Sequence, residues 1–346
     1  MFPLKTIDLF AGIGGIRKGF EMTGKFRTVF ANDHDRNCKL TYDRNFATTK
    51  LTLADIKDIS IKGGNIPEFD FLVGGFPCQA FSVAIHGKGF RDEKGRGVLF
   101  SEIERILREA IEVQSRPPVG FFLENVRNLK SHDGGKTFAI IMQKLSEAGY
   151  FLDHKIYNSL NFGVPQNRER IYIVGFRDPK RLARFEWPEP NNNARPKVAD
   201  ILERDVDPNY YYNGTPLFEK IKTHVTNPNY VYLYRRNHVR VHRDGHSPTL
   251  VASMGLGGHN VPIIRDLKGI RRLTPKECAR LQGYGDLQFP PGLADANAYK
   301  QIGNSVTVPV VKRIADAIAD ALEADLRTGL VPSKKPLLRE LQLAYI

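Results

Sequence analysis

One cysteine in this chain is better placed than the others to act as a nucleophile. Cys78 follows Pro77 shortly after an apolar run, residues 69–73, that is typical of a buried strand. In open α/β sheets, ligands and chemistry are placed at the carboxyl ends of strands. The two other cysteines, Cys38 and Cys278, lie in helical patterns, and the chain has no CxxC pair. We therefore expect no disulfide framework and no metal site, and we interpret Cys38 and Cys278 as packing residues.

A glycine-rich turn near the amino terminus predicts a cofactor site. The turn Phe10-Ala11-Gly12-Ile13-Gly14-Gly15 follows a strand pattern and precedes a helical one. Glycines let a ligand approach the amino end of the helix closely. Asp33 ends the next strand pattern, where a carboxylate accepts hydrogen bonds from ribose hydroxyls. The spacing of the glycines differs from G-x-G-x-x-G, so it favours a nucleoside-type cofactor over a dinucleotide; the alternative is a plain strand-to-helix turn.

Charge and composition favour a soluble enzyme with a polyanionic partner. The chain has 346 residues, of which 41% are hydrophobic, enough for a large core and a smaller one. Its 51 Lys and Arg against 38 Asp and Glu give a formal net charge of +13, which favours nucleic acid. No apolar run reaches the roughly 20 residues of a membrane span, and no signal-peptide pattern begins the chain. We expect a cytoplasmic, nucleoid-associated protein with no membrane contact.

Alternating strand and helix patterns in the first half predict a doubly wound α/β fold with a mostly parallel sheet. The predicted strands cover residues 6–10, 29–32, 69–73, 119–123, 155–158 and 171–176, and the first predicted helix covers 16–23. A polar turn at 163–170 separates the last two strands. This domain is expected to end near Trp187, where prolines and asparagines replace helical periodicity.

The remaining chain predicts a second, smaller domain and a return to the first. Residues 189–265 indicate an irregular, mostly β lobe, and residues 266–299 a hinge. Within the hinge a short helix is expected, with Thr274 as its cap, Pro275 at its first position and Glu277 three residues after the cap. Helical spacing of apolar residues at 310–326 indicates that residues 300–330 rejoin domain 1–188. We assign no role to the tail, 331–346.

Five segments in this order resemble the motifs of the DNA (cytosine-5)-methyltransferases, in particular the compact prokaryotic restriction-modification type. They are residues 10–15, Pro77-Cys78-Gln79, Glu124-Asn125-Val126, Gln166-Asn167-Arg168-Glu169-Arg170 and Gly303-Asn304-Ser305-Val306. The resemblance covers nearly the whole chain. It implies a Rossmann-like methyltransferase domain, a target-recognition domain and S-adenosyl-L-methionine as the methyl donor.

The resemblance also implies which residues carry the reaction. Cytosine C5 is a poor nucleophile, and addition of a thiolate at C6 turns C5 into an enamine-like carbon that can attack a methyl group. Cys78 is the expected nucleophile. Negative charge that develops at N3 and O2 needs a protonated carboxyl and a guanidinium, and the resemblance gives these roles to Glu124 and Arg168. Asn125 and Gln79 complete the expected catalytic set.

Cofactor contacts are also carried over from the resemblance. Phe10 and His34 would flank the adenine, Asp33 would bind the ribose and Asp55 the exocyclic amine. Two positions depart from the family pattern: Asp33 stands where Glu is usual, and His34 where a larger aromatic residue is frequent. The full expected set is Phe10, Ala11, Gly12, Gly14, Gly15, Asp33, His34, Asp55, Ile56, Pro77, Leu99, Asn304 and Val306.

The predicted partner is double-stranded DNA, bound by a monomer; a cognate restriction endonuclease would share the site without needing to bind this chain. Because the target carbon lies inside the base stack, the cytosine must be flipped out, and the polar, basic loop 79–99 could hold it. Residues 230–243 interleave aromatic and basic side chains, which suits contact with phosphates and bases, or a half-buried strand. The expected DNA contacts are Ser82, Lys88, Arg91, Arg170, Arg235, Arg236, Arg240, Thr249, Leu250 and Gly257.

The sequence leaves three other functions to consider. A transfer RNA methyltransferase of the same family would share the Pro77-Cys78 and Glu124-Asn125 chemistry, but its usual Cys-Phe-Thr signature is absent. A catalytically silent DNA-binding subunit would not need Cys78 or Glu124. A dehydrogenase is disfavoured by the glycine spacing. The DNA sequence that would be recognised cannot be read from the residues, because such lobes follow no simple code.

Overall fold

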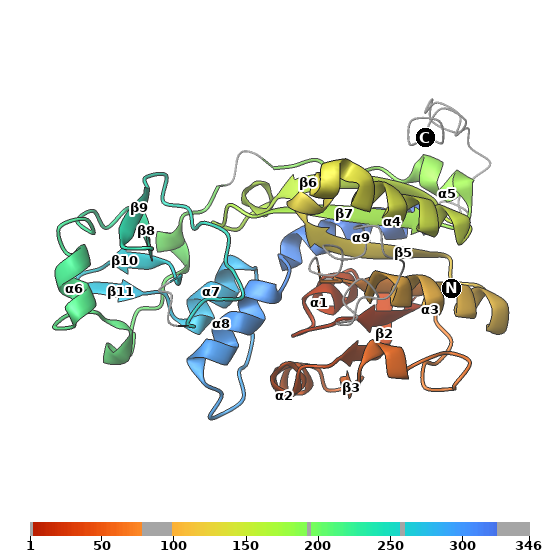
Figure 1. The fold of residues 1–346 in the computed structure, drawn as a ribbon, viewed down its shortest axis with the longest axis horizontal. Helices are drawn as coiled ribbons and strands as arrows, with labels where there is room; N and C mark the ends of the chain where they lie inside the picture. The colour runs from red at the N-terminus through yellow and green to blue at the C-terminus, as the bar shows by residue number, and fades with distance from the viewer. Residues whose placement is uncertain (1–2, 78–98, 192–194, 257–259, 324–346) are drawn as a thin grey trace.

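A mixed sheet of seven strands forms the large lobe in the computed structural model, which describes residues 3–77, 99–191, 195–256 and 260–323 (Figure 1). In spatial order the strands are β3 (Thr52–Leu53), β2 (Phe26–Asp33), β1 (Leu4–Leu9), β4 (Phe71–Gly74), β5 (Gly120–Val126), β7 (Glu169–Phe176) and β6 (Phe151–Asn158). The pairs among β1 to β5 are parallel, and β7 runs antiparallel to both its neighbours. The mostly parallel α/β architecture predicted from the sequence is confirmed.

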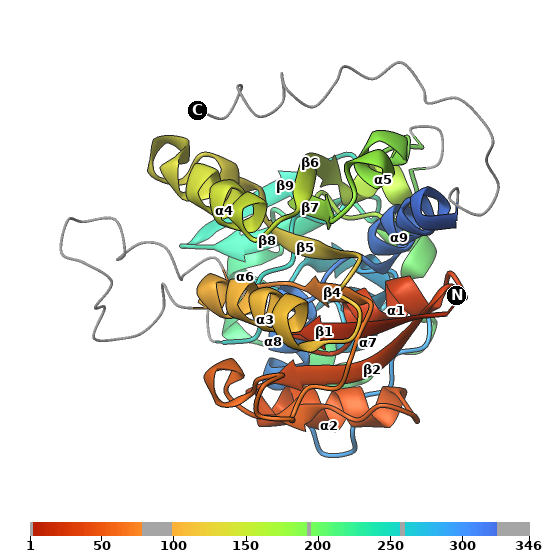
Figure 2. The same cartoon turned by 90° about the vertical axis from the view of Figure 1, so that its right-hand side faces the viewer.

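Helices cover both faces of this sheet, because side chains of a strand alternate between its faces. Phe121 and Phe122, neighbours on β5, belong to different clusters: Phe121 packs with residues of α3 and α4, and Phe122 with residues of α1, α5 and α9. Figure 2 shows these two groups on opposite sides of the sheet. The helices are α1 (Gly15–Glu21), α2 (Arg36–Asn45), α3 (Leu99–Val113), α4 (Lys136–Glu147), α5 (Pro179–Arg184) and α9 (Val308–Glu323).

The second lobe is built on a small antiparallel sheet. Its strand order is β11 (Ile270–Arg272), β10 (Ile263–Arg265), β8 (Val231–Arg235) and β9 (His238–His242), with α6 (Pro216–Ile221) beside it (Figure 1). Because β11 belongs to this sheet, the small lobe extends into the segment expected to be a hinge. Short 3₁₀ turns complete the described chain at Ile56–Asp58, Arg127–Lys130, His132–Gly135, Ser159–Phe162, Val198–Ile201 and Pro208–Tyr210.

Two helices, α7 (Pro275–Leu281) and α8 (Asp295–Asn304), lie between the lobes in Figure 1. The predicted start of α7 is confirmed: the Glu277 backbone N–H donates to Thr274 Oγ1 at 3.1 Å, and the Thr274 N–H donates to Glu277 Oε2 at 2.8 Å. After α8 the chain continues into α9, which packs against α1 in the large lobe. None of the helices in the described ranges is long and apolar enough to cross a bilayer.

Candidate active site

The glycine turn after β1 leaves open space at the amino end of α1. Gly12 has a φ of +54°, and a Cβ built there would meet no atom of the described residues within 4 Å. Gly15 differs, because a Cβ there would come within 2.3 Å of Tyr284 Oη and 2.8 Å of Ser305 Oγ. The turn is therefore open at Gly12 and tightly packed against the C-terminal segment at Gly15.

Asp33, at the end of β2, is held beside this turn by two backbone groups. The Gly12 N–H donates to Oδ2 and the Asp35 N–H donates to Oδ1, both at 2.9 Å. Each carboxylate oxygen has a further acceptor position, so the pair can still receive hydroxyl groups. The open glycine turn, the helix amino end and this oriented carboxylate fit a nucleoside-type ligand.

The other expected cofactor residues have varied exposure. His34 and Asp55 are exposed; Asp55 caps the 3₁₀ turn after β3 by accepting from the Lys57 N–H at 3.0 Å. Ile56 is buried in the core beneath it. The others also differ in exposure: Phe10 and Leu99 are half-buried, Ala11, Gly14, Gly15 and Val306 are buried, and Pro77 and Asn304 are exposed.

Glu124 is a buried carboxyl near the carboxyl end of β5. It is 8% exposed, and its Oε1 lies 3.0 Å from Nε of Arg170 on β7. Burial raises the pKa of Glu124 above its ordinary value, although Arg170 and then Arg168 lower it. Its neighbour Asn125 donates through Nδ2 to the Phe76 carbonyl at 2.8 Å, which fixes the chain just before Pro77. A buried carboxyl whose pKa is raised by desolvation is thus held close to the segment that leads into Cys78.

Arg170, rather than Arg168, is the guanidinium beside Glu124. In the β5–β7 register Glu124 pairs with Tyr172 and Val126 with Arg170, so Glu124 and Arg170 are diagonal neighbours on one face. Arg168 precedes β7 and points elsewhere. It is 2% exposed and donates through Nη1 to the Leu250 carbonyl at 2.9 Å and through Nη2 to the carbonyls of Gly303 and Ser305. The geometry therefore places Arg170 beside Glu124 and Arg168 among backbone carbonyls.

Apart from Arg170, which lies beside Glu124, the expected DNA contacts fall into three groups. Arg235, Arg236 and Arg240 are exposed and, with His238, line a surface hollow at the β8–β9 hairpin. The side chain of Leu250 is 1% exposed and packs in a core cluster, so we withdraw it as a DNA contact; Thr249 is half-buried, and its Oγ1 donates to the Asn167 carbonyl at 2.7 Å. The remaining residues of the catalytic and DNA-contact sets lie outside the described residues: Cys78, Gln79, Ser82, Lys88, Arg91 and Gly257.

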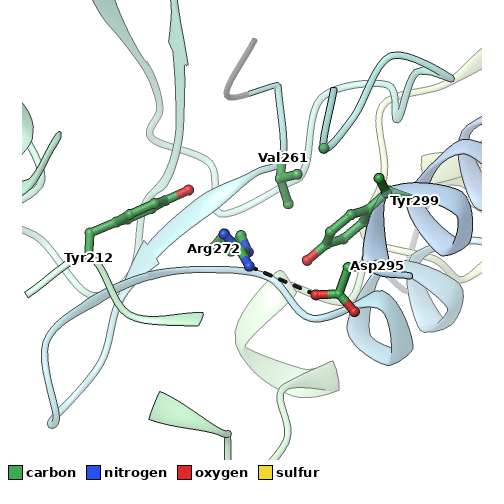
Figure 3. Close-up of a pocket in the computed structure, with 7 residues that line it drawn as sticks. Tyr212, Val261, Arg272, Asp295 and Tyr299 are labelled. Atoms are coloured by element: carbon green, nitrogen blue, oxygen red, sulfur yellow. Dashed lines mark ion pairs between the residues drawn. The ribbon is translucent and has the colours of Figure 1, made fainter. Parts of the chain in front are cut away.

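A further pocket lies where the small lobe meets α8. Figure 3 shows Arg272 between Tyr212 and Tyr299, with an ion pair to Asp295 whose Nη2 to Oδ2 distance is 3.8 Å. None of the expected catalytic or cofactor residues that the structure describes lines it. Across the described ranges, no group of three or more His, Cys, Asp or Glu side chains could hold a metal ion.

Asp8 is a buried carboxyl that the sequence reading did not single out. It lies on β1, is fully buried, and neither carboxylate oxygen has a hydrogen-bond partner among the described residues. Burial raises the pKa of Asp8 to about 8, against the opposing effect of Arg17. The folded state therefore keeps a proton that the unfolded chain, with a pKa of 3.8 at this residue, has lost.

This arrangement predicts a pH-dependent stability. Because the folded state holds the Asp8 proton more tightly than the unfolded chain, the free energy of unfolding is highest near pH 4. It falls as the pH rises toward 8, since the unfolded chain gains by losing this proton. We expect Asp8→Asn to raise the melting temperature at pH 8, by roughly 5 °C, and to leave it nearly unchanged at pH 4. Thermal denaturation of both proteins across this range measures the difference, and a difference that does not vary with pH would contradict the assignment.

A protein family and individual proteins both match this chain over most of its length. The profile of the family described as C-5 cytosine-specific DNA methylase matches residues 4–320. The chain is 44% identical over 320 residues to the type II methyltransferase M.Bsp6I of Bacillus sp. (strain RFL6), covering 91% of this chain and 98% of that protein. It is 41% identical over 332 residues to the type II methyltransferase M.HaeII of Haemophilus aegyptius, covering 94% and 96%.

Solved structures resemble this fold at low sequence identity. The Entamoeba histolytica methyltransferase EhMeth superposes with a TM-score of 0.72 at 18% identity, covering 95% of this chain and all of that one. The S. pombe Dnmt2 methyltransferase gives a TM-score of 0.69 at 18% identity, covering 92% of this chain and 99% of that one. At such identity these structures show that the fold is shared.

Proposed function

Because this chain belongs to the C-5 cytosine-specific DNA methylase family, we propose that it methylates C5 of a flipped-out cytosine in double-stranded DNA through a covalent bond between Cys78 and C6. It is a DNA (cytosine-5-)-methyltransferase. As its relatives are named type II methyltransferases, we propose that it protects host DNA in a restriction-modification system. The observation that carries the mechanism is the buried Glu124 carboxyl, paired with Arg170 beside the chain leading to Cys78.

Addition at C6 is the step that these residues would assist. The Cys78 thiolate gives its electron pair to form the S–C6 bond. The C5=C6 pair moves to form C4=C5, and the C4=N3 pair moves onto N3, which takes a proton from Glu124. The raised pKa of Glu124 supports this role, since burial favours the protonated form of the carboxyl. Arg170, 3.0 Å from Glu124, is placed to stabilise charge at O2 of the base. Once C5 has received the methyl group, N3 returns its proton to Glu124. Loss of the C5 proton to a base then supplies the electron pair that re-forms C5=C6 and expels the Cys78 thiolate.

S-adenosyl-L-methionine would supply the electrophilic methyl group on its sulfonium. Asp33 would receive the ribose hydroxyls, since both of its oxygens are oriented by backbone N–H groups and retain acceptor capacity. The open turn at Gly12 would admit the nucleoside to the amino end of α1, with Asn304 and Val306 closing the far side. His34 is 82% exposed, so it can turn to cover an adenine ring.

DNA recognition is proposed to come from two places. The basic hairpin with Arg235, Arg236 and Arg240 is exposed and suits contact with phosphates and base edges. Loop 79–99, with Ser82, Lys88 and Arg91, would hold the flipped base by contacts to the strand; apart from Leu99 it lies outside the described residues.

The proposed function is tested by expressing the chain in a host that lacks cytosine methylation and sequencing its DNA after bisulfite treatment. We expect 5-methylcytosine at one position of a short recurring sequence. In parallel, the purified protein should transfer labelled methyl groups to duplex DNA and not to transfer RNA. Labelling of transfer RNA alone, or binding of DNA without transfer, would overturn the proposal.

A further inference from the structure

Arg168 joins segments from three distant parts of the chain. Its own turn belongs to the large lobe, Leu250 begins the segment 250–256 of the expected recognition region, and Gly303 and Ser305 flank the cofactor residue Asn304. We call this arrangement, Arg168 with the carbonyls of Leu250, Gly303 and Ser305, the Arg168 junction. All three carbonyl acceptors are backbone atoms, so the junction depends on where these segments lie.

Direct backbone contact reinforces the junction. A Cβ built on Gly303 would lie 2.3 Å from both the carbon and the oxygen of the Val251 carbonyl and 2.6 Å from the Ala252 nitrogen. Real Cβ atoms do not approach other atoms so closely, and backbone atoms cannot turn aside as a flexible side chain can. Gly303 is thus the residue that allows segments 250–252 and 303–305 to touch.

The charge of Arg168 makes these contacts interdependent. Among the described residues it forms no ion pair with a carboxylate, and Nε has no hydrogen-bond partner. Burial lowers the pKa of Arg168 to about 9, and the nearby Arg170 adds to this effect. A buried guanidinium that loses some of its acceptors is left with unpaired polar groups, which is costly. The junction is therefore more stable when segments 250–252 and 303–305 are both in place than when only one of them is.

Both ends of the junction lead to proposed ligand sites. Segment 250–256 continues into the glycine-rich part of the recognition region, and segment 303–305 continues into Val306, which contacts the amino end of α1 at Gly15. Arg170, two residues beyond Arg168, pairs with Glu124. A ligand that orders segment 250–256 would thus also order the cofactor residues next to segment 303–305, and the reverse would hold for the cofactor.

We propose that Arg168 is a positioning residue that couples the DNA-reading segment to the cofactor pocket, so that each ligand strengthens binding of the other. This inference rests on the proposed function, because it takes DNA and the nucleoside cofactor as the two ligands. Such coupling is reciprocal: the factor by which DNA improves cofactor binding equals the factor by which the cofactor improves DNA binding.

The test is a binding cycle with S-adenosylhomocysteine and duplex DNA that contains the methylated sequence. In the wild-type protein we expect each ligand to lower the Kd of the other by the same factor, roughly 5 to 150. In Arg168→Lys, which keeps the charge but loses the planar fork of donors, the factor should fall close to 1, while each ligand still binds alone. Unchanged coupling in this variant would refute the proposal.

A second variant perturbs the same contact without changing Arg168. Gly303→Ala should push segment 250–252 away from 303–305 and likewise bring the coupling factor close to 1. The matched control is Arg271→Lys, a buried arginine, 1% exposed, whose ion-pair partners Glu277 and Asp266 are not residues of the junction. This change should lower the melting temperature and keep the coupling. Loss of coupling in the control as well would point to general destabilisation and count against the proposal.

Hydrogen exchange on the wild-type protein keeps the inference testable if both variants fail to fold. The Leu250 N–H donates to Gln166 Oε1 at 3.0 Å, and the Met254 N–H donates to the Val251 carbonyl at 3.1 Å. Adding S-adenosylhomocysteine alone should slow exchange at these amides. Cofactor binding with no such change would contradict the proposal, whereas absence of methyl transfer with coupling intact would instead contradict the proposed function.

Discussion

Methyl transfer by Glu124→Gln is expected to be about 10²- to 10⁴-fold slower than in the wild-type protein, with little change in the binding of cofactor or duplex. The carboxyl is buried, and its raised pKa favours the protonated form that N3 of the cytosine requires. Glutamine has nearly the same shape and can donate a hydrogen bond, but it cannot transfer a proton. Single-turnover rates on duplex DNA measure the loss.

The wild-type rate of methyl transfer should decrease with rising pH as Glu124 loses its proton. Because Glu124 must be protonated at the start of the addition step, the rate that depends on it falls as the pH rises through the raised pKa of this carboxyl. Arg170 and Arg168 lower that pKa, so neither favours the acid form. In Glu124→Gln this limb of the profile should disappear.

Glu104→Gln is the matched control for this change. Glu104, on α3, has a carboxylate as poorly exposed as that of Glu124, with side chains 12% and 10% exposed. It pairs with Arg108 at 3.0 Å and Lys144 at 2.9 Å, far from the proposed chemistry in sequence and on another element. We expect a modest loss of stability and an unchanged transfer rate. A normal rate in Glu124→Gln would remove Glu124 from the mechanism.

The sheet and the glycine-rich turn that follows β1 could be predicted because their signals are local. Apolar runs bounded by glycines and polar residues give the strands, and the turn at 10–15 sits between one such run and a helical pattern. Asp33 could be placed for the same reason, since it ends the next strand, and the structure gives its carboxylate two backbone donors.

The roles of the two arginines could not be separated from the sequence, because they depend on strand register. The sequence pattern predicts one polar turn over residues 163–170, whereas Glu169 and Arg170 already belong to β7. Pairing with β5 puts Arg170 diagonally across from Glu124, and leaves Arg168 outside the strand among carbonyls of distant segments. Contacts between residues more than 80 positions apart carry no local signal.

Leu250 illustrates a related limit. An apolar residue in a presumed DNA-reading segment can face a base or the core, and only the packing decides. Here its side chain is buried, while its backbone N–H and carbonyl bind Gln166 and Arg168. Leu250 therefore contributes through its backbone hydrogen bonds, which its residue type does not reveal.

Cys78→Ser is expected to abolish methyl transfer, because the rest of the mechanism depends on the thiolate. A cysteine thiol with a pKa near 8.5 can be ionised at neutral pH by nearby positive charge or backbone N–H groups, whereas a serine hydroxyl stays protonated and adds to C6 far more slowly. The variant should keep its fold and its binding of duplex DNA. Retained transfer would exclude Cys78 as the nucleophile.

DNA that carries 5-fluorocytosine at the methylated position distinguishes the role of Cys78 from that of Glu124. Fluorine at C5 blocks the elimination that would free the enzyme, so the wild-type protein should form a stable covalent adduct when the cofactor is present. Cys78→Ser should form none, since the bond to C6 cannot be made. Glu124→Gln should form the same adduct, only more slowly, because the thiolate is intact and the proton for N3 must come from water. An adduct in Cys78→Ser, or wild-type speed in Glu124→Gln, would assign the addition step to other groups.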